Sequence, residues 1–230
     1  MNVERRGGSP ARVAVIVLGY ALVHSLLASR QAKGAARRMF GARVRNGLYR
    51  FLFNAQAVLL FAWAALAFVR LPDRTLYHIP APWSWAMYGA QLGGIGLMGW
   101  AATTVGIPDM TGLGPLVALV RGDRPKREPE AQGPVLGADG EMLVRGPFAF
   151  TRHPANWGPF VVVLFFPRMT VNRATLAVLS VAYLVAGSIH EEYRLLAAHR
   201  RPYQRYRSRV PFLLGGTREL RSAGDARRAG

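Results

Sequence analysis

Apolar residues gather in five long segments, and basic segments separate them. Four of the five hold no Asp, Glu, Lys or Arg, and the remaining one is interrupted by Arg152 and His153. A helix that crosses a bilayer needs about 17 to 25 mostly apolar residues. The pattern therefore predicts an all-α fold: a polytopic integral membrane helical bundle of about five transmembrane helices, with a cytoplasmic C-terminal helix. The five segments are 13–28, 51–69, 83–106, 147–167 and 174–189.

The charge of the chain follows the same division. Of the 230 residues 51% are hydrophobic, yet 30 Lys and Arg stand against 12 Asp and Glu, so the formal net charge is +18. Seven basic residues lie in 30–50, five in 121–145 and ten from Arg194 onward, whereas the alternate loops hold few. Lys and Arg are held on the cytoplasmic side of a membrane. We therefore expect an integral protein of a bacterial inner membrane with a cytoplasmic C-terminus.

The placement of the basic residues also indicates partners. The basic loops would face the anionic headgroups of membrane lipids, which are the expected partners. Basic residues confined to loops between apolar segments do not form the basic stripe of a nucleic-acid-binding domain, so no nucleic-acid partner is expected. The sequence leaves the oligomeric state open.

The alternation divides the chain into five parts. We expect the proline-containing stretch 121–140 within the connector to act as a flexible linker or lid, and the basic C-terminal tail to be disordered. The parts are an N-terminal tail at 1–12, transmembrane helices one to three at 13–106, a cytoplasmic connector at 107–146, a C-terminal part at 147–214 with helices four and five and the cytoplasmic helix, and a tail at 215–230.

Two patterns resemble functional motifs but have simpler explanations. The run from Gly94 to Gly99 fits the dinucleotide-binding pattern GxGxxG, but it lies inside an apolar segment and not between the strand and the helix that this motif requires. Close helix packing explains these glycines better. The five histidines show no metal-ligand spacing and the chain has no cysteine, so no metal site is expected.

A charged pair, Arg152 and His153, stands directly before Pro154 within the fourth apolar segment. Burying an arginine in hydrocarbon costs several kcal/mol, so Arg152 must face water, headgroups or a polar pocket. Pro154 suits the first turn of a helix, and the N-terminus of a helix attracts anions. The sequence therefore predicts a site here for a small anionic group such as a carboxylate.

Two acids, Glu191 and Glu192, follow the last apolar segment at once. The short linker 168–173 predicts a hairpin of the last two helices, which brings Arg152 and His153 back to the same face as the two acids. We therefore expect one polar cavity lined by both groups. A surface salt bridge, such as one between Glu191 and Arg194, is the alternative.

These residues carry a family resemblance. The order GPF-x-x-x-RHP-x-x-x-G over 146–158, then EE-x-x-L from Glu191, then two tyrosines ahead of Val210-Pro211, resembles the isoprenylcysteine carboxyl methyltransferase and phospholipid methyltransferase superfamily. Within it, the likeness is greater to the NnrU-like and methanethiol S-methyltransferase branch. The resemblance implies an integral membrane enzyme that binds S-adenosylmethionine between its last two spans and a cytoplasmic C-terminal helix.

The resemblance also implies roles for individual residues. His153 and Glu191 are the expected catalytic residues. Three positions depart from the family: Asn156 and Phe148 stand where a tyrosine is common, and Gly187 replaces an arginine that contacts the prenylcysteine substrate, which disfavours a carboxylate-bearing prenyl acceptor. The expected cofactor-binding residues are Leu143, Phe148, Arg152, His153, Pro154, Asn156, Trp157, Gly158, Glu191 and Glu192.

The chemistry of the cofactor agrees with these residue types. Arg152 or a helix N-terminus suits its carboxylate, and the two acids suit its ammonium or its ribose hydroxyls. We expect a S-adenosylmethionine-dependent methyltransferase whose acceptor is a small thiol or another small or lipophilic molecule. The alternatives are a non-catalytic NnrU-like membrane protein that keeps the fold, and a lipid or prenylcysteine carboxyl methyltransferase.

Overall fold

A computed structural model describes residues 7–127 and 133–212 of the chain. The described residues are mostly helical, as predicted, and a two-stranded sheet that the sequence did not predict joins two of the loops. In chain order the elements are α1 (Pro10–Ala28), α2 (Arg30–Val69), β1 (Thr75–His78), α3 (Trp83–Val105), α4 (Ile107–Thr111), α5 (Leu113–Val120), the 3₁₀ turn η1 (Gly146–Ala149), α6 (Pro154–Leu164), β2 (Arg168–Thr170) and α7 (Val171–Arg209).

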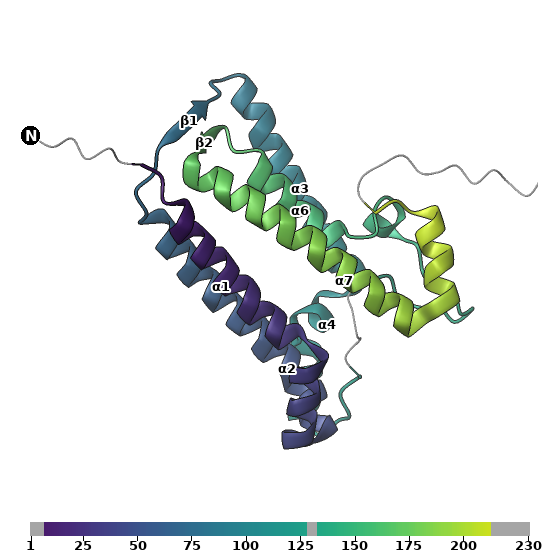
Figure 1. Cartoon of the computed structure of the whole chain (residues 1–230). Coiled ribbons are helices and arrows are strands. Elements are labelled where there is room, and N and C mark those ends of the chain that lie inside the picture. Colours follow the sequence, from purple (N-terminus) through teal and green to yellow (C-terminus); the bar gives the residue numbers. More distant parts are fainter. Residues whose placement is uncertain (1–6, 128–132, 213–230) are drawn as a thin grey trace, which may run out of the picture.

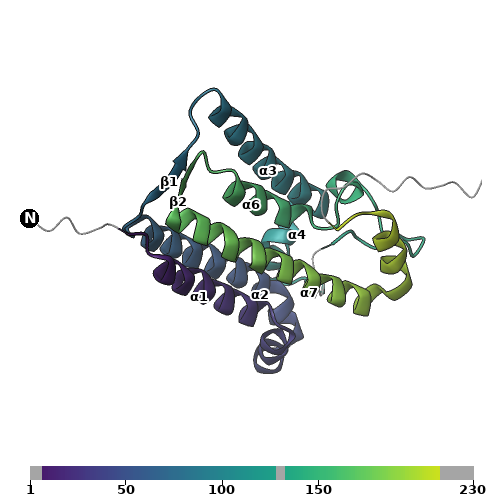
Figure 2. The same cartoon turned by 45° about the horizontal axis from the view of Figure 1, so that its top comes forward.

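Helix α7 runs through the middle of the arrangement. Helix α1 packs along one side of α7 with the antiparallel α2 against it, and α6 packs along the other side with α3 against it (Figures 1 and 2). The short helices α4 and α5 follow α3 and return to pack against α2. This layering places the start of α6 beside the second half of α7.

Three helices, α1, α2 and α7, are long and apolar enough to cross a membrane. The predicted count of five spans is not confirmed. Helix α3 is 23 residues long but does not reach the required hydropathy, and α6 has only 11 residues, or about 16 Å of helix. Helix α6 ends early because Pro167 favours an extended conformation in the residue before it.

The long helices expose a large amount of apolar surface. On α1, α2 and α7, Leu22, Leu59 and Val178 are 61%, 71% and 69% exposed, and many other apolar side chains on these helices are similar. A water-soluble protein rarely exposes contiguous apolar surface of this kind. Helices whose backbone groups are bonded internally can present such a surface to lipid.

The N-terminal end of α7 is fastened by the two-stranded sheet and by a buried asparagine. β1 pairs antiparallel with β2. Beside them, Asn172 donates through its side chain to the carbonyl of Pro72 at 3.0 Å and accepts from the backbone N–H of Ser9 at 2.6 Å. These contacts fix the start of α7 against the loop after α2, at the end of the molecule opposite the C-terminal helix (Figure 1).

Helices α3 and α6 touch through two glycines. A Cβ added at Gly94 would lie 3.1 Å from the carbonyl oxygen of Gly158, and one added at Gly158 would lie 2.6 Å from the carbonyl oxygen of Gly94. The packing interpretation of the glycine pattern is therefore confirmed for Gly94. It does not extend to Gly96 or Gly99, where an added Cβ would meet nothing within 4 Å.

Helix α7 is broken near its C-terminus, so that its last part turns back. Arg200 has φ 42° and ψ −115°, and Pro202 two residues later has no N–H for the helix ladder. The returning part buries Tyr203 and Tyr206 against Leu195, Met142 and Val210. The predicted C-terminal helix is thus the continuation of α7 beyond a kink.

The second half of the connector is attached to this returning helix. Leu136 and Met142 form an isolated bridge that closes a tight turn, and Glu141 beside it forms a two-point ion pair with Arg205. Residues 133–145 therefore pack onto α7. The flexible stretch predicted at 121–140 includes 128–132, which lie outside the described residues, as does the tail predicted at 215–230.

The glycine contact generates a stability prediction. Replacing Gly158 by Ala forces a methyl group into Met98 and the backbone of α3, and overpacking of this kind costs about 1–3 kcal/mol. We expect a lower thermal unfolding midpoint for detergent-solubilised Gly158→Ala. Gly99→Ala on α3 is the matched control, since an added Cβ there meets nothing. Equal midpoints for the two variants would contradict the contact.

Candidate functional site

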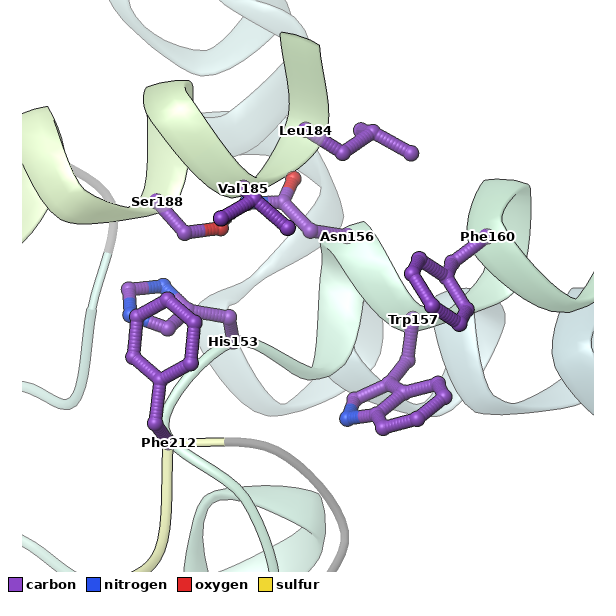
Figure 3. Close-up of a pocket in the computed structure, with 8 residues that line it drawn as sticks. All are labelled: His153, Asn156, Trp157, Phe160, Leu184, Val185, Ser188 and Phe212. Carbon is purple, nitrogen blue, oxygen red and sulfur yellow. Dashed lines mark hydrogen bonds between the residues drawn. The ribbon is translucent and has the colours of Figure 1, made fainter. Parts of the chain in front are cut away.

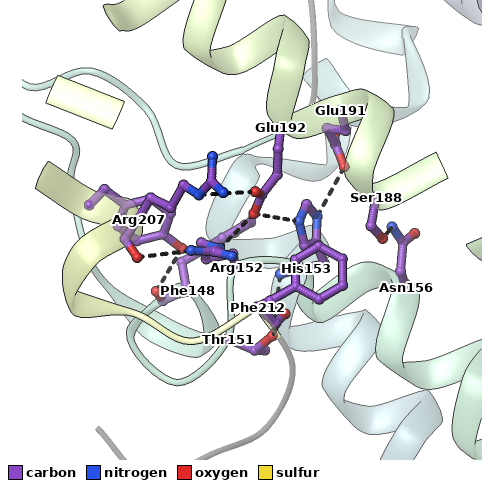
Figure 4. Close-up of polar contacts among 11 residues, drawn as sticks. Phe148, Thr151, Arg152, His153, Asn156, Ser188, Glu191, Glu192, Arg207 and Phe212 are labelled. Carbon is purple, nitrogen blue, oxygen red and sulfur yellow. Dashed lines mark hydrogen bonds and ion pairs between the residues drawn. The ribbon is translucent and has the colours of Figure 1, made fainter. Parts of the chain in front are cut away.

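The candidate site lies where the turn before α6 meets the second half of α7. Thr151, Arg152 and His153 form the turn between η1 and α6, and His153 is the N-cap residue of α6. Glu191 and Glu192 project from α7 toward this turn (Figure 4). The structure therefore brings together the two charged groups that the sequence placed 39 residues apart along the chain.

The carboxylate of Glu192 lies at the centre of a buried ionic network. Its Oε1 is 2.6 Å from Nε of Arg152 and 3.3 Å from Nε2 of His153, and its Oε2 is 3.5 Å from Nε of Arg207. The side chains of Arg152 and Glu192 are only 9% and 8% exposed. A buried carboxylate is costly unless it is paired, so these three cationic groups account for its position.

Arg152 contacts both Glu192 and the segment beyond the kink in α7. Besides Glu192, its Nη1 donates to the backbone carbonyl of Arg207 at 2.8 Å, and its guanidinium lies 5.6 Å from the ring centre of Phe212. The pair of Arg152 with Glu192 is buried, so it is not a surface salt bridge. Its guanidinium fixes the returning part of α7 against the start of α6.

His153 is held between the two acids. Its Nδ1 is 3.3 Å from Oε2 of Glu191, and its Nε2 is 3.3 Å from Oε1 of Glu192. Burial favours the neutral ring, but the hydrogen bonds and charges of Glu191 and Glu192 outweigh it, so the pKa of His153 is raised. Both ring nitrogens donate in the imidazolium form, which matches one carboxylate on each side.

The segment after α7 closes one side of the site. The ring of Phe212 meets the imidazole of His153 edge to face at 4.9 Å. The hydroxyl of Thr151 donates to the carbonyl of Phe212 at 3.1 Å, and the hydroxyl of Tyr206 donates to the carbonyl of Phe148 at 2.9 Å. The C-terminal residues therefore cover the turn Thr151–His153 (Figure 4).

Two cavities adjoin the network, and both have His153 and Asn156 in their linings. Asn156 bridges from α6 to α7 by donating to the hydroxyl of Ser188 at 2.7 Å. The first cavity, between α6 and α7 (Figure 3), is lined by His153, Asn156, Trp157, Phe160, Leu184, Val185, Ser188 and Phe212. The second cavity is lined by Ala101, Val105, Met110, Phe148, Arg152, His153, Pro154, Ala155, Asn156 and Glu191.

Most of the predicted site residues line these cavities, and three do not. Glu192 lies in the ionic network behind them. Leu143 lies in the turn of the connector, where its N–H donates to the carbonyl of Val135 at 2.8 Å. Gly158 packs against Gly94 of α3. The predicted residues that line a cavity are Phe148, Arg152, His153, Pro154, Asn156, Trp157 and Glu191.

Sequence reasoning missed several lining residues. Ser188 stands one helical turn before Glu191 and Glu192, so helical spacing could have found it. No sequence pattern indicated Ala101 of α3 or Met110 of α4, because both lie far along the chain from the other residues of the site. Arg207 and Phe212 reach the site only through the kink at Arg200.

The described part of the chain holds no group of three or more His, Cys, Asp or Glu side chains arranged to bind a metal ion. The polar groups that the second cavity offers to a ligand are instead the carboxylate of Glu191, which is 22% exposed, and the first turn of α6. They suit an organic ligand that carries both a cationic and an anionic group.

Comparison with known proteins gives one partial likeness. The chain is 34% identical over 67 residues to a methanethiol S-methyltransferase of Crocosphaera subtropica (strain ATCC 51142 / BH68). The match covers 29% of this chain and 26% of that protein, so the chain spans about a quarter of the relative that it matches. No family model matches, and no solved structure matches significantly. The likeness supports a methyltransferase-like family at most.

The raised pKa of His153 generates a pH prediction. The folded state binds this proton more tightly than the unfolded state does, so the stabilisation is fully present below about pH 6.5. It is lost as the pH rises through the raised pKa. We expect the thermal unfolding midpoint of the wild type to fall between pH 6 and pH 9 more steeply than that of His153→Gln, which has no titrating ring. Parallel pH profiles would contradict the paired imidazolium.

Proposed function

We propose that this protein is an integral membrane methyltransferase that uses S-adenosylmethionine. The observation that carries the proposal is the partly exposed carboxylate of Glu191 at the wall of a cavity, held beside a buried network of Arg152, His153 and Glu192. Titratable groups with perturbed pKa values cluster at functional sites, and here such groups line a cavity. The partial likeness to a methyltransferase agrees with this site.

The second cavity offers partners for the cofactor. Glu191 suits the ammonium group or the ribose hydroxyls, because a carboxylate accepts from both. The first turn of α6 at Pro154 and Ala155 presents the positive end of the helix to a carboxylate. Phe148 lines the same cavity and offers an aromatic face. The sequence assigned Arg152 to the cofactor carboxylate. In this proposal Arg152 instead contacts Glu192 and Arg207 and so positions the turn before α6.

The protein's part in the reaction is alignment and control of a proton. S-adenosylmethionine, when bound, supplies a methyl group on a cationic sulfonium. The surrounding residues hold the acceptor in line with that methyl and exclude water. His153 faces a carboxylate with each ring nitrogen and its pKa is raised, so the partly exposed Glu191 is the group that takes the proton of a thiol acceptor. His153 orients Glu191 for this role.

The apolar helices support the membrane location, and the named activity of the partial relative favours a small thiol among the possible acceptors. The membrane orientation with the C-terminus in the cytoplasm follows from the basic residues of the tail and of 30–50. In that orientation the site lies at the cytoplasmic end of α7, where a cytoplasmic cofactor has access.

The two adjacent acids generate a paired prediction. Glu191→Gln removes the exposed carboxylate and should weaken S-adenosylmethionine binding at least tenfold in calorimetry of the purified protein. Its unfolding midpoint should fall less than that of Glu192→Gln, since Glu191 is 22% exposed and pairs with His153 alone among the described contacts. Glu192→Gln should instead lower the midpoint strongly, because it leaves Arg152 and His153 buried with less compensating charge; breaking a buried pair costs about 3–5 kcal/mol.

Wild-type cofactor affinity in Glu191→Gln would overturn the assignment of that carboxylate. The absence of any S-adenosylmethionine binding to the wild type would support a non-catalytic membrane protein instead. Equal losses of stability in the two variants would contradict the different environments of the two acids.

A transfer experiment tests the acceptor class. We expect membranes that contain the protein to move label from methyl-labelled S-adenosylmethionine into a volatile thioether when a small alkyl thiol is supplied. The volatile fraction, the lipid fraction and the protein fraction are counted separately. Membranes with Glu191→Gln serve as the control. Label in the lipid or protein fraction alone would rule out a small thiol as the acceptor.

A further inference from the structure

An exposed surface outside the two cavities combines basic and apolar side chains. It is formed by α2 around its break, at 37–44, and by the end of α5 with the residues that follow, at 117–124. We call it the α2–α5 surface. The first part of α2 lies at the foot of the molecule, beyond the end of α1 (Figure 1). None of these residues lines either cavity.

Packing of the folded chain joins the two segments of this surface. The guanidinium of Arg43 donates to the carbonyl of Gly122, 79 residues further along the chain. Beside this contact α2 approaches α5 closely, because a Cβ added at Gly47 would lie 2.6 Å from the Cβ of Leu119. The surface is therefore a product of the tertiary structure, and each segment by itself carries only part of it.

Four apolar side chains of this surface are exposed. Met39, Phe40 and Val120 are 73%, 60% and 78% exposed, and Val44 is 37% exposed. Met39 and Phe40 stand directly before Gly41, which breaks α2 with φ 79° and ψ 163°, a conformation that glycine adopts readily. Exposed apolar side chains that gather among polar ones mark an interaction site.

The charged side chains of the same surface are almost all basic. Asp123 is the one acid in 30–50 and 113–127. A partner of this surface must therefore offer negative charge as well as apolar material. The exposed basic residues are Arg37, Arg38, Arg43, Arg121 and Arg124.

The neighbouring helices place this surface at a boundary of the bilayer. Helix α1, one of the three helices long and apolar enough to cross a membrane, ends at Ala28, and α2 begins at Arg30. The apolar part of α2 at 51–69 comes after the basic part. The general preference of Lys and Arg for one side of a membrane explains the basic residues of this connection. It does not explain why Met39 and Phe40 are exposed among them.

Helical spacing gives the first part of α2 an apolar side and a polar side. Ala32, Ala36 and Met39 follow one another at intervals of four and three residues, so they share one side, and Arg30 and Arg38 point away from it. A basic amphipathic helix of this kind lies in the membrane interface, with its apolar side at the boundary between headgroups and acyl chains.

We propose that the α2–α5 surface docks on a bilayer of anionic phospholipid. Met39, Phe40 and Val120 enter the boundary of the acyl chains, and the arginines bind lipid phosphates. Each basic residue near an anionic membrane strengthens such attachment about fivefold. The docking is independent of the proposed methyltransferase function, since it uses no residue of either cavity.

The test measures the depth of single spin labels on the full chain in nanodiscs, either of neutral phosphatidylcholine or with anionic phosphatidylglycerol added. The chain has no cysteine, so Phe40→Cys and Val120→Cys each give one labelled position. In anionic nanodiscs we expect both labels to be relaxed by oxygen, which concentrates among acyl chains, and to be shielded from a water-soluble nickel chelate. In neutral nanodiscs the chelate should reach both.

Two controls separate docking from general attraction. Gln31→Cys labels the opposite side of the same helix from Phe40, because nine residues at about 100° each leave them half a turn apart, and this label should stay accessible to the chelate. Arg37→Gln with Arg38→Gln should lower the ratio of inserted to water-exposed Val120 label about 25-fold. Arg201→Gln with Arg209→Gln removes the same charge from exposed positions of α7 and should leave that ratio unchanged.

Three outcomes would overturn the proposal. One is free access of the chelate to the labels at positions 40 and 120 in anionic nanodiscs. Another is equal shielding in the two lipids, which would indicate that a second copy of the chain or another apolar contact covers the surface. The third is an equal effect of the two double arginine variants, which would leave only the net charge of the chain. All the substituted side chains are exposed, so the variants should fold as the wild type does.

Discussion

The structure depends on compensating one buried carboxylate. Glu192 projects from α7 into an interior that a charged group enters only when it is paired. Its partners come from three places in the chain: Arg152 and His153 from the turn before α6, and Arg207 from the returning part of α7. Satisfying this one group therefore fixes the start of α6, the middle of α7 and the C-terminal segment relative to one another. The lining residues that come from these three segments are positioned by that arrangement.

The same network gives two adjacent acids different properties. Successive residues on a helix point about 100° apart, so Glu192 turns into the network while Glu191 stays at the wall of a cavity. His153 lies between them, and both acids raise its pKa. The carboxylate that stabilises the fold, Glu192, and the carboxylate that is accessible to a ligand, Glu191, thus belong to adjacent residues of α7. The cavity that carries Glu191 also has Arg152 in its wall, whereas the other has no Asp, Glu, Lys or Arg among its described lining residues.

Much of the fold and part of the site could be predicted from the sequence. Continuous apolar segments predicted the helices α1 and α7 and the second half of α2. The length and the periodicity of such a segment can be read from neighbouring residues alone. Pro154 marked the start of α6. The contributions of Ala101 and Met110 could not be predicted, because they depend on how α3 and α4 pack against distant parts of the chain. Leu143 and Gly158 were assigned to the cofactor by motif alone, and in the structure they line neither cavity.

By itself the sequence determined that Arg152 and His153 would meet Glu191 and Glu192. A short linker between the last two helices folds them into a hairpin, which brings the residues before α6 next to the acids on α7. Opposite charges placed next to each other in this way attract. Only the tertiary structure decided which acid is buried and which faces a cavity, because that depends on the rotation of α7 and on Arg207, which arrives through the kink at Arg200. It also decided that the site has two cavities. These features arise from contacts between elements, and no local pattern encodes them.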